Sequence, residues 1–157
     1  MEPKIGLTQE QRAGVIGLLK TLLADEYILY TKTRNYHWNV KGPLFSDLHK
    51  FFESQYEAID ESIDEVAERI RALGGVAPGS LAEMLALGTL RETPGGGLNA
   101  QEMVGSLLED HEQVIVFLRG SLETSANRFG DAGTSDFLTG LMEEHEKMAW
   151  MLRSMVE

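Results

Sequence analysis

Apolar residues recur along most of the chain at the three- and four-residue spacing of an amphipathic helix. No useful stretch alternates with the period of two that is typical of a strand, so no sheet is expected. Thr8 and Gln11 fit a capping box, and they predict a first long helix from Gln9 to Tyr36, before Gly42 and Pro43 break the chain. The apolar positions that define this helix are Val15, Ile16, Leu18, Leu19, Leu22 and Leu23.

Glycines and two further capping pairs, Ser80 with Glu83 and Asn99 with Glu102, set predicted limits of the remaining helices. They are a second helix from Ser46 to Leu73, a short helix from Ser80 to Gly88, a third long helix from Asn99 to Asn127 and a fourth from Ser135 to Val156. The connection from Gly74 to Leu98 is long enough to cross the length of a bundle. The pattern therefore predicts an all-α, ferritin-like four-helix bundle with an up-down-down-up path and a short helix between the second and third helices.

Composition narrows the classes of function. The chain has 157 residues, no cysteine and a formal net charge of −11. This length suits one domain, residues 1–157, and the negative charge repels nucleic-acid phosphates. The lack of cysteine excludes thiol catalysis and cysteine-based metal sites. No apolar run approaches 18 residues and no signal peptide is recognisable, so a cytoplasmic protein is the expectation.

The second predicted helix carries a stripe of metal-capable side chains beside its apolar face. At about 100° per residue, these side chains fall within about 100° of one another around the helix axis. They are His49, Glu53, Glu57, Asp60, Asp64 and Glu68. A solvated acidic face would give the same pattern. Several like charges are four residues apart with no Lys or Arg inside the stripe, which favours a bound cation. Histidine and carboxylates together suit iron, manganese or zinc better than calcium.

Helix geometry restricts how such a site could form. His49 and Asp64 are 15 residues apart in the sequence, which is about 22 Å along a helix, so one metal cannot contact both in a single chain. Two copies of the helix packed antiparallel would place His49 and Glu53 of one beside Asp64 and Glu68 of the other. If these residues form one site, it is expected between two-fold-related subunits.

The other histidines and Trp38 have simpler interpretations when each is taken alone. His37 is interpreted as a packed or capping residue, and Trp38 as a core residue. His111 and His145 lie among carboxylates but lack a Glu three residues before them, so the Glu-x-x-His motif of di-iron bundles is absent. Both are predicted to lie at the surface or to line a cavity.

Three segments resemble the Dps family, the DNA-binding proteins from starved cells or mini-ferritins. They are Tyr36 to Pro43 with Leu48 and His49, Asp64 to Gly75, and His145 to Ser154. The resemblance covers nearly the whole chain. It implies a hollow dodecamer that binds Fe(II) between two-fold-related subunits, oxidises it preferentially with hydrogen peroxide, and stores the ferric product.

The resemblance also implies specific site residues. The family's ligands match His37, His49, Asp64 and Glu68, with Trp38 as the aromatic beside the centre. The remaining ligand is commonly Asp, and Glu53 stands in its place here. A ferroxidase with a di-iron centre is expected, which zinc or manganese could also occupy, while a different di-metal oxidase and a DNA-compacting protein are the alternatives.

Two further expectations concern iron access and DNA. The family's three-fold pores are acidic near the start of the last helix, where Asp131 and Asp136 lie, although capping would also explain these residues. Family members that bind DNA often use a tail rich in Lys and Arg. Only Lys4 is basic before the first predicted helix, and the sequence ends at Glu157. Weak or absent DNA binding is therefore expected.

Overall fold

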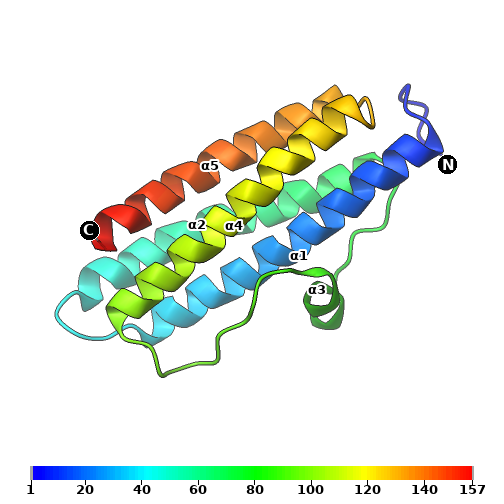
Figure 1. The fold of residues 1–157 in the computed structure, drawn as a ribbon. Coiled ribbons are helices and arrows are strands. Elements are labelled where there is room, and N and C mark those ends of the chain that lie inside the picture. The colour runs from blue at the N-terminus through cyan, green and yellow to red at the C-terminus, as the bar shows by residue number, and fades with distance from the viewer. Residues whose placement is uncertain (1, 157) are drawn as a thin grey trace.

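The computed structural model describes residues 2–156. Its helices are α1 (Gln9–Asn39), α2 (Phe45–Ala72), α3 (Leu81–Leu87), α4 (Ala100–Asn127) and α5 (Ala132–Val156). No strand occurs within the described residues. The four long helices form one bundle, in which α1 and α5 run one way and α2 and α4 run the other way (Figure 1). The all-α fold and its up-down-down-up path are therefore confirmed.

Three predicted helix limits were wrong, because the hydrogen bonds at the helix ends differ from those that the sequence indicates. The first helix extends to Asn39, since Val40 still donates its N–H to Tyr36. The second begins at Phe45 without a side-chain cap, and Ser46 lies inside its first turn. The last begins at Ala132 because Asp131 accepts the N–H of Thr134. The capping boxes that begin α1, α3 and α4 were predicted correctly.

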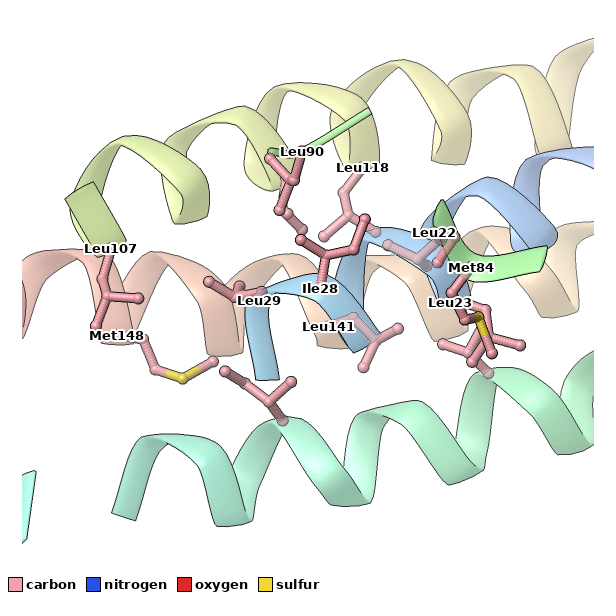
Figure 2. Packing of buried hydrophobic residues seen from close by; sticks show 14 of the residues in the cluster. Leu22, Leu23, Ile28, Leu29, Met84, Leu90, Leu107, Leu118, Leu141 and Met148 are labelled. Carbon is pink, nitrogen blue, oxygen red and sulfur yellow. The ribbon is translucent and has the colours of Figure 1, made fainter. Parts of the chain in front are cut away.

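The core is built from apolar side chains on all five helices and on the connector after α3. Leu22, Leu29, Leu107 and Leu141 come from three of the long helices and point into the interior at different levels along the bundle, and Leu90 of the connector belongs to the same core (Figure 2). The apolar face predicted for α2 is largely confirmed, because Leu48, Phe52, Ile59, Val66 and Ile70 are buried and Ile63 is half-buried.

Helix α1 is unusual because it buries charged side chains as well as apolar ones. Asp25, Glu26 and Lys32 are each at least 95% buried. A buried charge must be paired or hydrogen-bonded, or folding becomes costly. Asp25 meets this requirement through the connector after α3, since its carboxylate accepts hydrogen bonds from the N–H groups of Thr89 (2.5 Å) and Leu90 (2.9 Å) and from the Thr89 hydroxyl (2.7 Å).

These bonds hold the connector against the outer side of α1. The chain makes its approach at Gly88, where an added Cβ would lie 2.4 Å from Ile28. Asp25 and Gly88 therefore fix the path by which the chain crosses from the end of α2 to the start of α4. No helix within the described residues is long and apolar enough to cross a membrane.

The first prediction concerns this connector. Asp25→Ala would leave two backbone N–H groups without their acceptor at a buried position, and it should lower the free energy of unfolding by about 2–4 kcal/mol. Urea unfolding at fixed protein concentration measures the change. Asp47→Ala, at an exposed position in the first turn of α2, is the control and should cost less than about 1 kcal/mol. Equal losses in the two variants would contradict the role of Asp25.

Candidate metal centre

His37 and His49 meet where α1 ends and α2 begins. The two rings stack with centroids 3.8 Å apart and planes inclined by 18°. His37 lies in the last turn of α1 and is buried, while His49 lies early in α2 and is half-buried. The short loop after Asn39 turns the chain back on itself, and Gly42 provides a positive φ of 112° in that loop. The fold thus brings together two residues that lie twelve positions apart in the sequence.

Reciprocal hydrogen bonds fix both imidazole rings. Nδ1 of His37 donates to the carbonyl oxygen of His49 at 2.7 Å, and Nδ1 of His49 donates to the carbonyl oxygen of His37 at 2.8 Å. A carbonyl oxygen can only accept, so each Nδ1 carries a hydrogen. In the neutral ring this leaves a lone pair on Nε2, which is the form that binds a metal ion. Hydrogen bonding of this kind orients metal-ligating histidines in proteins.

Aromatic rings enclose this histidine pair. Phe45 stacks on His49 with centroids 5.1 Å apart, and Tyr56 approaches His37 edge-on at 5.3 Å. Loss of solvent raises the pKa of the Tyr56 phenol, and the nearby carboxylates of Glu53 and Glu57 raise it further. The carboxylates of Glu53 and Glu57 therefore act on the phenol that borders His37.

Trp38 does not belong to the core, contrary to its interpretation from sequence. Its side chain is 64% exposed. The guanidinium of Arg34 lies 5.1 Å from the Trp38 ring centre and also faces Tyr30 and Tyr56, so a cation–π contact holds the aromatic group together. Trp38 points outward because it follows His37, whose own position on α1 faces inward.

The remaining predicted ligands lie along α2. Glu53 is half-buried one turn beyond His49, whereas Asp64 and Glu68 are exposed further along the helix. Because α2 is a continuous helix, Asp64 is about 22 Å from His49 along its axis. No group of three or more His, Asp and Glu side chains within residues 2–156 is arranged to hold a metal ion. One chain thus presents two partial donor sets, and their union in one centre remains a prediction.

Comparison with known proteins identifies the family. Residues 16–157 match the family model described as the Ferritin-like domain. A low temperature-induced protein of Nostoc sp. is 54% identical, over 98% of this chain and 86% of its own. DNA protection during starvation protein 2 of Bacillus anthracis is 41% identical, over 89% of this chain and 94% of its own. This chain belongs to the Dps family.

A solved structure agrees with this Dps assignment. The Dps protein of Vibrio cholerae is described as a member of a broad superfamily of ferritin-like diiron-carboxylate proteins. It superposes with a TM-score of 0.93 and 31% identity, covering 99% of this chain and 97% of its own. The Dps chain described here is therefore also a member of that superfamily.

The prediction for His111 and His145 was wrong, since both rings are completely buried in the Dps bundle. Nδ1 of His111 lies 2.9 Å from Nδ1 of His145, and Nε2 of His145 lies 2.8 Å from Oε1 of Glu26. Helical spacing contained the missed signal. His111 lies four residues after Leu107, and His145 four after Leu141, so both continue buried faces. Their carboxylate neighbours favour an exposed position for the histidines. Glu109, Glu112 and Glu144 are indeed exposed, but they lie on other sides of their helices than the histidines.

Asp131 and Asp136, the predicted pore residues, have different surroundings in this Dps chain. Asp131 is buried, accepts the Thr134 N–H at 2.9 Å and pairs with Arg69 at 3.1 Å. It caps α5, so its charge is already neutralised within the chain. Asp136 is exposed on α5 and keeps its charge available to solvent.

The second prediction tests this distinction. Asp131→Ala removes both the cap and the partner of Arg69, and it should lower the free energy of unfolding by about 2–4 kcal/mol. Asp131→Asn should cost less, because asparagine also caps helices well. Asp136→Asn is the exposed control and should change the value by no more than about 0.5 kcal/mol. Urea unfolding of the three variants measures these values, and equal costs for the Ala and Asn variants at 131 would exclude capping.

Proposed function

We propose that this Dps protein is a ferroxidase that oxidises Fe(II) with hydrogen peroxide, and O₂ more slowly, and stores the ferric product inside a hollow dodecamer. The observation that supports this most directly is the histidine pair at the helix junction. His37 and His49 are both oriented by backbone carbonyls through Nδ1, so that in the neutral ring Nε2 is the nitrogen left to bind a metal ion.

The proposed centre lies between two subunits related by a two-fold axis. His37, His49 and Glu53 of one chain would face Asp64 and Glu68 of a second copy. Antiparallel pairing of two α2 helices makes this union twice in each dimer, which accounts for ligands spaced too far apart for one chain. Imidazole nitrogens with carboxylate oxygens suit Fe(II), and manganese or zinc would also fit this donor set.

The proposed ligands would hold two iron ions while these ions transfer two electrons to hydrogen peroxide. Two Fe(II) ions give two electrons to one hydrogen peroxide, which takes up two protons and leaves two Fe(III) ions and two waters. The carboxylates of Glu53, Asp64 and Glu68 favour the more highly charged product, because they compensate its added positive charge. Glu53 reaches one methylene further than the Asp that is common in the family.

Iron access and storage follow from the acidic surface. Asp136 is the residue we assign to a three-fold pore, where three exposed carboxylates would draw cations toward the interior. Asp131 would contribute mainly by holding the start of α5 beside that pore. A cytoplasmic location is part of the same proposal.

DNA compaction is the alternative role, and charge argues against it here. The chain carries a formal net charge of −11, so the assembled protein and the DNA backbone repel each other at neutral pH. Weak or absent DNA binding is proposed for this member, with hydrogen peroxide and Fe(II) as its main partners.

The third prediction concerns oxidation. His37→Ala and Asp64→Ala each remove a proposed ligand, and each should slow peroxide-driven Fe(II) oxidation by at least about tenfold. Stopped-flow absorbance after anaerobic Fe(II) loading measures the rate. Glu65→Ala is the matched control, because Glu65 is an exposed carboxylate next to Asp64 that lies outside the acidic stripe. Rates unchanged in both ligand variants would refute the site.

The fourth prediction concerns assembly. Twelve chains of 17.4 kDa give a particle of about 209 kDa. Sedimentation velocity at micromolar protein should show this species for the wild type and for Asp64→Ala, since the change is confined to the polar centre proposed between the subunits. A monomer or dimer alone in the wild-type sample would exclude mineral storage in a shell.

A further inference from the structure

A chain of three titratable side chains crosses the middle of the bundle, away from the proposed iron centre. Glu26 comes from α1, His111 from α4 and His145 from α5, and all three have an exposed fraction of 0%. His145 lies between the other two, with Nδ1 2.9 Å from Nδ1 of His111 and Nε2 2.8 Å from Oε1 of Glu26. The proposed ferroxidase chemistry uses none of them.

The short distance between the two Nδ1 atoms limits how many protons the two rings can hold. Only one hydrogen can lie between the two Nδ1 atoms, because two N–H groups cannot point at each other at 2.9 Å. The four ring nitrogens can therefore hold at most three protons while the contact exists. Three ring protons make one imidazolium, whose charge the Glu26 carboxylate balances. A fourth proton would make two imidazolium rings and break the contact.

The groups around the cluster offer no way to absorb a second positive charge. Lys32 of α1 and Asp110 of α4 form a separate buried ion pair at 2.5 Å and neutralise each other. The buried polar residues of α2 are Gln55 and Ser62, which do not titrate, and α3 buries only Met84. Oε2 of Glu26 and Nε2 of His111 are buried without a hydrogen-bond partner among the described residues.

We propose that Glu26, His145 and His111 form an acid-sensitive lock that joins α1 to α4 and α5. The lock holds one positive charge but not two, so mild acid favours separation of these helices. The device is independent of the iron centre and adds a conformational response to pH. Consistent with this geometry, burial and then the neighbouring His145 hold the pKa of His111 well below its ordinary value.

Proton linkage determines how the stability of the fold depends on pH. An unfolded histidine has a pKa of about 6.5, so below this pH the two unfolded rings bind four protons. The folded cluster binds three, and unfolding therefore takes up one proton. Stability therefore falls as the pH drops below about 6.5, and the unfolding equilibrium constant approaches a tenfold rise per pH unit about one unit lower, where the two unfolded rings hold four protons. This range lies above the pH near 4 at which ordinary carboxylates titrate, while burial raises the pKa of the neighbouring Asp110 carboxyl.

The experiment compares urea unfolding of the assembled protein at fixed chain concentration between about pH 7.5 and about pH 5. The wild-type midpoint should fall once the pH drops below about 6.5. His111→Asn places an amide where Nδ1 lies but cannot titrate, so its midpoint should lose most of this fall. Leu107→Ala is the matched control, because Leu107 is fully buried one turn earlier on α4. Its midpoint should be lower at every pH but parallel to the wild type.

Glu26→Gln provides an independent test that does not require His111→Asn to fold. The amide oxygen still accepts from His145, but its lack of charge leaves a third ring proton without compensation. The folded cluster should then hold two ring protons, and unfolding below about pH 6.5 should take up two, giving about a hundredfold change per pH unit. The lock is overturned if His111→Asn falls as steeply as the wild type, or if Glu26→Gln has the wild-type slope.

Discussion

The need to pair the charges that α1 buries determines how the rest of the bundle is arranged. Asp25 requires N–H donors, Glu26 requires His145, and Lys32 requires Asp110. Each partner comes from a different part of the chain: the connector, α5 and α4. A shift of α1 by one turn would leave all three charges without partners, at a cost of several kcal/mol each. Apolar packing alone would tolerate more than one arrangement of four helices.

Much of the architecture could be predicted because the signals for it are local. The capping boxes at Thr8, Ser80 and Asn99 are short-range patterns, and they mark helix starts correctly. The start of α2 could not be found in this way, because a turn after Gly42 begins it and no side chain caps it. The predicted start of α5 is three residues late because Gly130 and Gly133 indicate a turn there, whereas Asp131 caps the helix before Gly133.

The sequence pattern alone predicts only part of the candidate site. Helical spacing alone places the carboxylates of α2 on one stripe, but it says nothing of His37, which belongs to another helix. The resemblance to the Dps family was needed to include it, and the structure then places its ring against that of His49. The acidic neighbours of His111 and His145 favour a position at the surface or along a cavity, but both rings are buried. Their positions four residues after buried leucines carried more information than their neighbours did.

The division of the bundle into two halves has a consequence for how the chain folds. The pairs α1–α2 and α4–α5 are each joined by a short loop, so each hairpin closes through contacts that are local in sequence. The contacts between hairpins join distant residues, and several of them are polar: Glu26 with His145, Lys32 with Asp110, and Arg69 with Asp131. Docking of the hairpins is then the step at which a wrong register meets an unpaired buried charge. We therefore expect selection of the correct register to depend on the contacts between the hairpins, since these contacts pair the buried charges.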